Sequence, residues 1–254
     1  MQFIDSHCHL NFSQFDLCRD ELAREAALQG VTDIVVPGVV ASDWHVIQQL
    51  SSSYLSIHTA LGLHPCFLNK HLESDLDRLE ESLSSGGGCA VGEIGLDLFI
   101  ADADIEKQLF FFQSQLDLAA QFSLPVLLHV RKAHDQVLKQ LRQYKLSSGG
   151  IVHAFSGSEQ QAKQYLALGF KLGLGGTVTY ERAKKLRHIV TELPLDSFVL
   201  ETDAPDMPLS GYQGEPNRPV RVKEVAQVIA ELKGCSLQEV ASATSLQASK
   251  LLDL

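Results

Sequence analysis

The chain has 254 residues, of which 45% are hydrophobic and 20% are charged, a composition that excludes an intrinsically disordered protein. It carries 21 basic and 31 acidic residues, and the formal net charge of −10 excludes a protein that coats nucleic acid by charge alone. No run of about 18 apolar residues is present, so we expect no membrane-spanning helix and no membrane partner.

Short apolar runs alternate with longer polar segments of helical periodicity along the whole chain. The runs that predict strands cover residues 3–7, 31–36, 55–62, 89–96, 124–130, 150–155, 170–175 and 198–203. Segments that predict helices include residues 16–29, 104–122, 159–168 and 220–232. This alternation predicts an α/β protein, a (β/α)8 TIM barrel that forms one domain over residues 1–254. A doubly wound open sheet is the alternative, because strand count alone does not prove closure.

The longest irregular segment, residues 206–219, follows the eighth predicted strand and contains several proline and glycine residues. Such a loop in a compact domain is usually functional or disordered. In a barrel it would lie over the face at which the strands end, where the active sites of TIM barrels are found. We therefore expect the functional residues at that face.

Histidines and acidic residues gather where predicted strands end. Glu93 and Asp203 lie late in the fourth and eighth strands. Five of the ten histidines occupy equivalent positions, namely His7, His9, His64, His129 and His153. Burying imidazoles beside carboxylates costs several kcal/mol unless the groups are paired or bind a metal. We expect solvated or locally hydrogen-bonded side chains for the other five, His45, His58, His71, His134 and His188.

These residue types are metal ligands. Two carboxylates and four imidazoles, those of His7, His9, His129 and His153, exceed the three or four protein ligands of one catalytic zinc ion. The inventory predicts two divalent ions bridged by Glu93. Nitrogen and oxygen ligands suit zinc, manganese, cobalt or nickel and admit magnesium, so the identity of the ions stays open.

Six motifs occur in order along nearly the whole chain: Asp5-Ser-His-Cys-His9, Gly62-Leu-His-Pro65, Gly92-Glu-Ile-Gly-Leu-Asp97, His129-Val-Arg131, His153-Ala-Phe155 and Glu201-Thr-Asp-Ala-Pro205. Together they resemble the TatD family of metal-dependent deoxyribonucleases, and residues 95–99 and 202–209 resemble its YjjV-like branch. The resemblance implies an amidohydrolase-type barrel. It also implies one ion held by His7, His9, Glu93 and Asp203, and another held by Glu93, His129 and His153.

The resemblance further implies that His64 and Arg131 approach the substrate phosphate. A guanidinium binds phosphate oxygens in a bidentate way. The segment 217–219 matches the family except at Arg218, where an acidic residue is common, and we expect Asn217 and Arg218 to meet phosphate too. Leu98 stands where the family often has an aromatic residue, and these departures leave substrate specificity open.

The leading hypothesis for function is hydrolysis of phosphodiester bonds in DNA. A hydroxide held between the two ions would attack phosphorus, and Asp203 would accept the proton of the water. Hydrolysis of C–N or ester bonds of a small molecule on the same barrel is the alternative, although Glu93 stands where many such enzymes have a carboxylated lysine. A metal-binding barrel without catalysis is the third hypothesis.

The cysteines indicate a reducing compartment. Five of them are scattered along the chain without a CxxC pair, and no apolar signal segment follows Met1, so we expect a cytoplasmic protein. Cys66 lies near the expected site, but we interpret it as a packing residue. No obligate protein partner is evident in the sequence.

Overall fold

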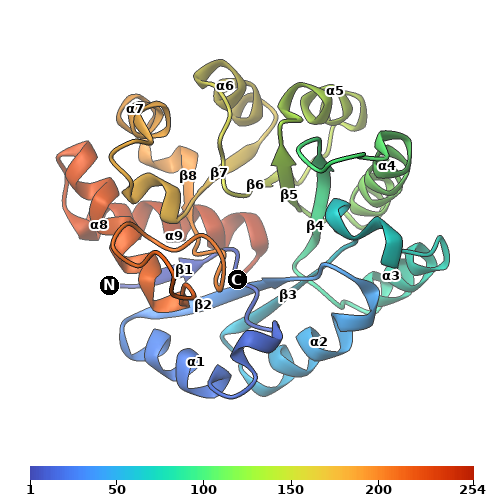
Figure 1. Cartoon of the computed structure of the whole chain (residues 1–254), viewed down its shortest axis with the longest axis horizontal. Helices are drawn as coiled ribbons and strands as arrows, with labels where there is room; N and C mark the ends of the chain where they lie inside the picture. The colour runs from blue at the N-terminus through green and yellow to red at the C-terminus, as the bar shows by residue number, and fades with distance from the viewer.

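The computed structural model describes all of residues 1–254, and its centre is a sheet of eight parallel strands (Figure 1). The strands are hydrogen-bonded in the order in which they occur in the chain. They are β1 (Phe3–Asp5), β2 (Val31–Pro37), β3 (Ile57–Leu61), β4 (Ala90–Asp97), β5 (Val126–Arg131), β6 (Gly150–Val152), β7 (Phe170–Leu174) and β8 (Phe198–Leu200). This consecutive order excludes the doubly wound alternative, in which the strand order reverses.

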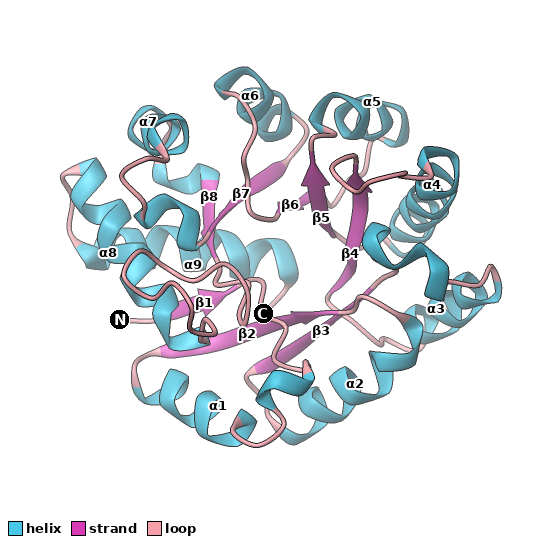
Figure 2. Ribbon diagram, viewed as in Figure 1, coloured by secondary structure: helices cyan, strands magenta, loops and turns pink.

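Helices surround the strands, as Figure 2 shows. They are α1 (Arg19–Leu28), α2 (Trp44–Ser53), α3 (Ser74–Ser84), α4 (Ile105–Phe122), α5 (His134–Tyr144), α6 (Glu159–Ala167), α7 (Lys184–Glu192), α8 (Val222–Lys233) and α9 (Leu237–Leu252). Each strand is followed by at least one helix, which confirms the predicted (β/α)8 barrel. None of these helices combines the length and the apolar content that crossing a bilayer requires.

Backbone hydrogen bonds join the first and last strands just beyond their ends. Ser6 N–H donates to the Leu200 carbonyl at 2.9 Å, and Asp203 N–H donates to the His7 carbonyl at 2.8 Å. Both bonds involve residues beyond the end of a strand. They bring the segment after β1 beside the segment after β8, although 196 positions separate His7 from Asp203 in the sequence.

Apolar side chains pack on both faces of the sheet. A cluster of 57 buried residues fills the layer between the strands and the outer helices. A smaller cluster has side chains from seven strands and two from α9: Ile4, Val35, Ala60, Ala90, Leu127, Ile151, Val199, Ala248 and Leu252. Because successive side chains of a strand point to opposite faces, the seven strand residues face the barrel interior. Helix α9 therefore closes that interior at one end.

Three strands end at least two residues earlier than predicted. β1 stops at Asp5, β6 at Val152 and β8 at Leu200, whereas the predicted strands ran to residues 7, 155 and 203. The backbone leaves the extended conformation where side chains turn toward the barrel mouth: φ is +43° at Ala154 and +58° at Asp203. Strand alternation therefore does not explain why His7 and His9 lie together, since both belong to the loop after β1.

Candidate metal centre

The loop after β1 is fixed by its neighbours on both sides. Cys8 N–H donates to the Val35 carbonyl at 3.0 Å, and His9 N–H donates to the Ala204 carbonyl at 2.8 Å. These bonds aim the two imidazoles at one point, so that the Nε2 atoms of His7 and His9 lie 3.3 Å apart. Neither Nδ1 atom of this buried pair has a hydrogen-bond partner.

The Asp5 carboxylate faces away from this point. It accepts hydrogen bonds from Thr202 Oγ1 at 2.6 Å and from Thr202 N–H at 2.9 Å. Burial raises the pKa of Asp5 to about 8, against the lowering effect of these bonds. Asp5 therefore links the end of β1 to the segment after β8 by hydrogen bonds, and it does not join the cluster of His7 and His9.

Glu93 lies at the centre of the cluster, and each of its oxygens faces different histidines. Oε2 lies 3.1 Å from His7 Nε2 and 3.6 Å from His9 Nε2. Oε1 lies 3.0 Å from His129 Nδ1 and 3.2 Å from His64 Nε2. The side chain is 2% exposed. A carboxylate in this position can bridge two cations, one at each oxygen.

Small residues let the Glu93 backbone approach β2 and β3. Glu93 N–H donates to the Gly38 carbonyl at 2.9 Å. A Cβ atom at Gly62 would lie 2.7 Å from the Gly92 carbonyl carbon, a distance that a side chain cannot occupy. Glycine at position 62 of the Gly62-Leu-His-Pro65 motif thus permits the close packing that sets Glu93 between the two histidine pairs.

His129 bridges two carboxylates. Its Nδ1 faces Glu93, and its Nε2 lies 2.9 Å from Asp97 Oδ2 at the end of β4. Burial lowers the pKa of His129, but hydrogen bonds with Asp97, Cys66 and Glu93 outweigh it and raise that pKa well above its usual value. Asp97 stood in a predicted motif without a role, and the structure shows that its carboxylate orients the ring of His129.

His153 is held in a similar way by Glu201. Its Nδ1 lies 3.0 Å from Glu201 Oε1, and its Nε2 lies 3.6 Å from Asp203 Oδ2. Glu201 fills the space beside Gly173, where a Cβ atom would lie 2.1 Å from the Glu201 carboxylate. Glu201 stood in a quoted motif without a role, and the structure shows that Gly173 provides the room for its carboxylate.

Asp203 completes the cluster from the loop after β8. Its Oδ1 lies 3.4 Å from His9 Nε2 and 3.7 Å from His7 Nε2. The His153 ring stacks on the His7 ring with the centroids 3.7 Å apart. His153 thus makes its carboxylate contacts with Glu201 and Asp203 rather than with Glu93, and it lies with His7 and Asp203 in one group of possible metal ligands.

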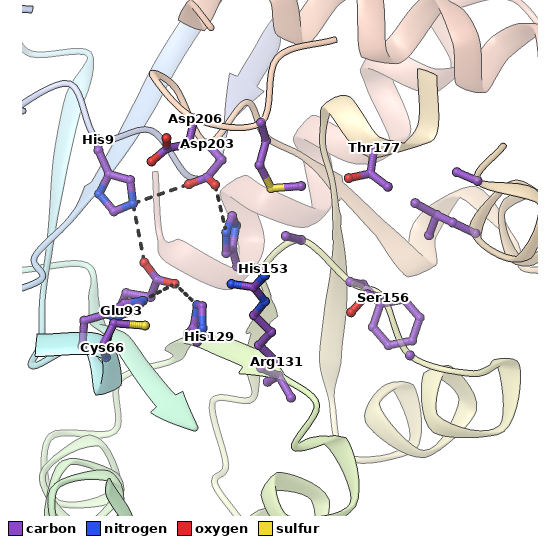
Figure 3. Close-up of a pocket in the computed structure, with 18 of the residues that line it drawn as sticks. His9, Cys66, Glu93, His129, Arg131, His153, Ser156, Thr177, Asp203 and Asp206 are labelled. Atoms are coloured by element: carbon purple, nitrogen blue, oxygen red, sulfur yellow. Dashed lines mark hydrogen bonds and ion pairs between the residues drawn. The ribbon is translucent and has the colours of Figure 1, made fainter. Parts of the chain in front are cut away.

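The residues of this site fit a metal centre. Nitrogen and oxygen atoms of His7, His9 and Glu93 lie within 4.8 Å of one another, as do those of His7, His153 and Asp203. Two imidazole Nε2 atoms 3.3 Å apart beside a carboxylate are arranged as ligands around a cation. The structure therefore brings all six expected ligands to one place at the barrel mouth. Figure 3 shows five of them, His9, Glu93, His129, His153 and Asp203.

Protonation states of the ligands follow from burial and from their neighbours. Burial disfavours ionisation of Glu93, but His64 and His7 hold the pKa of this carboxyl well below its usual value. Burial lowers the pKa of His7, and it lowers that of His64 to about 4. Ionised Glu93 and neutral His7 are in the form that binds cations, whereas the carboxylates beside His129 and His153 raise the pKa of both imidazoles and favour their protonated forms.

A pocket of about 720 Å³ opens above the cluster. Its lining includes His64 and Arg131, the latter with its guanidinium 3.9 Å from the centre of the Phe99 ring. Cys66 also lines the pocket and is exposed, with Sγ 3.4 Å from Asp97 Oδ2. The interpretation of Cys66 as a packing residue is therefore wrong.

Asn217 and Arg218 do not reach this pocket. Asn217 is fully buried and donates hydrogen bonds to the carbonyls of Thr202 and Met207 at 2.8 and 3.2 Å. Arg218 is exposed and lies 3.6 Å from Glu25 of α1. The geometry gives Asn217 the task of fastening the long loop and gives Arg218 a surface ion pair, so neither contacts a phosphate at the cluster.

Comparison with known proteins agrees with this geometry. Residues 4–253 match the family model described as TatD related DNase. The chain is 44% identical to YjjV, a metal-dependent hydrolase of Escherichia coli strain K12, over 95% of this chain and 94% of that protein. It is also 30% identical to the 3'-5' ssDNA/RNA exonuclease TatD of Erwinia billingiae, over 98% of each chain.

The same likeness appears in three dimensions. The crystal structure of Escherichia coli YjjV superposes on this chain with a TM-score of 0.96 at 43% identity, covering 99% of this chain and 98% of that one. The similarity therefore extends over the whole barrel and includes every loop that carries a residue of the cluster.

Proposed function

The chain belongs to the TatD family of metal-dependent hydrolases, and we propose that it hydrolyses phosphodiester bonds of DNA or RNA strands with residues 1–254 acting as one catalytic domain. The observation that carries the proposal is the position of Glu93, whose two carboxylate oxygens face separate histidines. The 3'-5' ssDNA/RNA exonuclease named among the relatives supports the substrate class.

In this proposal the six ligands bind two divalent ions. His7, His9, Glu93 and Asp203 hold one ion, and Glu93, His129 and His153 hold the other. Support for the first set comes from the contacts of Glu93 Oε2 and Asp203 Oδ1 with both His7 and His9. Support for the second comes from Glu93 Oε1, which lies 3.0 Å from His129 Nδ1. His153 joins the cluster through His7 and Asp203, two ligands of the first set. Divalent ions held by these residues would supply a nucleophile from water and would neutralise charge on the phosphoryl oxygens.

The chain's own groups then have distinct tasks. Asp203 accepts the proton that the water loses. Burial raises the pKa of Asp203, but His153 and His9 outweigh burial and hold that pKa far below its usual value, so the carboxylate is ionised and ready to bind a cation. Its place at the mouth of the cluster, with Oδ1 3.4 Å from His9 Nε2, is what supports the role as base. Arg131 and His64 orient the phosphate from the pocket wall.

Hydrolysis assays test this function directly. Protein freed of metal by a chelator is loaded in turn with zinc, manganese, magnesium, cobalt and nickel, and is then offered labelled single-stranded DNA, single-stranded RNA and bis(p-nitrophenyl) phosphate. We expect at least one metal to restore cleavage of a phosphodiester, and the chelated protein to show none. Cleavage of amides or carboxylic esters, with no cleavage of any phosphodiester under every metal, would overturn the proposal.

A further inference from the structure

The pocket has two sides of opposite charge. Its acidic lining residues, Glu93, Asp203 and Asp206, all lie around the metal cluster. Four basic residues also line it, and three of them lie at the start of α7 or just before it: Arg182, Lys184 and Lys185. The chain as a whole is acidic, with 31 acidic and 21 basic residues. A side of the pocket that has several cationic side chains and no carboxylate is therefore unlike the rest of the protein in charge.

We call this side the basic wall and define it as Arg182, Lys184 and Lys185. Figure 3 shows Ser156 and Thr177 on the side of the pocket across from His9 and Cys66. Lys185 Nζ donates a hydrogen bond to the Ser156 carbonyl at 3.3 Å. The basic wall is therefore separate from the ligand cluster but opens into the same cavity.

The charges of the basic wall are uncompensated. No carboxylate lies within ion-pair distance of any of its three side chains. Arg182 contacts the Tyr180 ring at 4.5 Å from its centre, and Lys185 contacts a carbonyl. Such contacts position a cation without neutralising it, so the wall retains its attraction for an anion.

The start of α7 adds to this attraction. Acidic residues are favoured in the first turn of a helix and cations are disfavoured, because the helix dipole is positive there. Helix α7 has no acidic residue in its first turn, and it begins with Lys184 and Lys185. The N-cap residue Ala183 provides no side-chain cap. An external anion at this turn would balance both the ammonium groups and the free backbone N–H groups.

The opposite side of the pocket offers aromatic rings. Phe12 is half-buried and stacks on the His9 ring, with centroids 4.4 Å apart and planes 11° apart. Phe67 is also half-buried and contacts the edge of His64. Unpaired bases stack on such rings whatever their sequence. The cavity of about 720 Å³ lies within the range of roughly 300–1,000 Å³ that holds whole organic ligands, and so offers space beyond a single phosphate.

We propose that the basic wall binds the phosphate of the nucleotide adjacent to the bond that is cleaved, and that this contact makes a single-stranded polynucleotide a better substrate than an isolated phosphodiester. The inference rests on the proposed function. The wall reads only phosphate charge, and it therefore serves DNA and RNA strands alike.

The test compares a wall variant with a variant of equal charge change. The wall variant carries Arg182→Ala, Lys184→Ala and Lys185→Ala. The control carries Arg24→Ala, Lys139→Ala and Lys250→Ala, which remove one arginine and two lysines that are exposed on α1, α5 and α9 and lie outside the pocket. Both are loaded with the metal that best activates the natural protein, and both are melted to check that they fold.

Kinetics and binding are then measured on two substrates. For a single-stranded oligonucleotide, we expect the wall variant to lose at least about tenfold in kcat/KM, mostly through KM, whereas the control changes little. For bis(p-nitrophenyl) phosphate, which has no adjacent phosphate, we expect kcat/KM within about twofold of the natural protein. The slope of log affinity against log salt for a labelled phosphorothioate strand, followed by fluorescence anisotropy, should fall by about 2.

Charge-preserving changes sharpen the test. Arg182→Lys with Lys184→Arg and Lys185→Arg should restore most of the affinity for the strand, because phosphate attraction needs the charge rather than one geometry. Equal losses on both substrates, or no loss on the strand, would overturn the proposal. A loss confined to DNA or to RNA would also overturn it.

Failure of the proposed function gives a different pattern. In that case the natural protein cleaves no phosphodiester at all, but anisotropy still reports strand binding. Strand binding that the wall variant loses and the control keeps would then support the basic wall without catalysis. Absence of strand binding by the natural protein would remove the basic wall as a site.

Discussion

The two ends of the barrel are built from the same strands but bury opposite kinds of side chain. At the end that α9 closes, residues such as Leu127 and Val199 form an apolar cluster. At the other end, histidines and carboxylates such as His7 and Glu93 are equally buried. Apolar burial stabilises the fold directly, whereas buried polar groups stabilise it only when each has a partner or a metal. One end therefore supplies stability and the other end supplies chemistry.

The largest effect is expected at the bridging carboxylate. Glu93→Gln keeps the shape of the side chain but removes the charge that faces His7 and His129. We expect activity to fall by at least about 10³-fold, because the groups that stabilise developing charge are lost together. Metal analysis should show that the content falls from about two ions per chain to one or fewer.

Glu81→Gln is the matched control for this change. Glu81 is exposed on α3, and its carbonyl accepts a hydrogen bond from Ser84 of the same helix rather than from any residue of the cluster. It should leave both metal content and activity unchanged. A Glu93→Gln protein that retains two ions and full activity would show that this carboxylate does not bridge the metals.

A substitution at the apolar end of the barrel should lower stability and leave activity nearly unchanged. Leu127→Ala removes a fully buried side chain from the cluster that α9 closes. We expect the free energy of unfolding to fall by about 3 kcal/mol, within the range for buried leucines, and kcat to stay within about twofold. Denaturant unfolding of the metal-free protein measures the first quantity.

Leu246→Ala, at a side chain that is 50% exposed on α9, should change the free energy of unfolding by less than about 0.5 kcal/mol. If Leu127→Ala lowered kcat by much more than twofold in the folded protein, the apolar end and the metal-binding end of the barrel would not be independent.

His134 is a buried histidine that lies outside the cluster of expected metal ligands, and its titration should affect stability rather than activity. His134 packs against Phe155 and Tyr165 away from the metal cluster, and burial lowers its pKa to about 4. An unfolded chain takes up this proton at about pH 6.5, whereas the folded chain resists it until about pH 4. The contribution of neutral His134 is therefore complete above pH 6.5 and is lost as the pH falls toward 4.

Comparison of the natural protein with His134→Gln measures this loss. Between pH 7 and pH 4 the natural protein should lose about 3 kcal/mol more of its free energy of unfolding than the variant does. His188→Gln, at an exposed position on α7, should follow the natural protein. An identical pH profile for natural protein and His134→Gln would contradict the assignment.

A variant at Asp203 distinguishes the role of this carboxylate as a metal ligand from its role as the base. Asp203→Asn keeps one oxygen ligand, but an amide does not accept a proton at neutral pH. In the proposed site, His7, His9 and Glu93 remain as ligands of the first ion. We expect kcat to fall at least about a hundredfold while most of the metal is retained. Near-normal turnover with full metal occupancy would show that Asp203 is not the base.

Much of this arrangement could be predicted from the sequence. Alternation of apolar runs with helical periodicity predicted the barrel, and histidines at strand ends predicted the cluster. Asp97 and Glu201 were not predicted, because their roles depend on which ring nitrogen of His129 and His153 they meet, and only the folded backbone determines that. The prediction that Arg218 meets phosphate was wrong, because its side chain pairs with Glu25 on the surface. The sequence of a loop does not reveal which way such a side chain points.

The smallest effect is expected at one of these unpredicted residues. Asp97 is buried, and its Oδ2 meets the His129 nitrogen that faces away from Glu93. It also accepts hydrogen bonds from Phe99 N–H and Cys66 Sγ. Partners of this kind fix the ring of a metal-binding histidine, and their loss typically costs about 10- to 100-fold in metal affinity or activity.

We therefore expect Asp97→Asn to weaken binding of the second ion by about 10- to 100-fold and to leave the first ion in place. Competition titration with a metal chelator should resolve the two affinities, and excess metal should restore most of the activity. Asp77→Asn, on the exposed side of α3, is the control and should change neither affinity. Equal weakening of both ions in Asp97→Asn would mean that Asp97 supports the whole site through the fold of β4 rather than through the ring of His129.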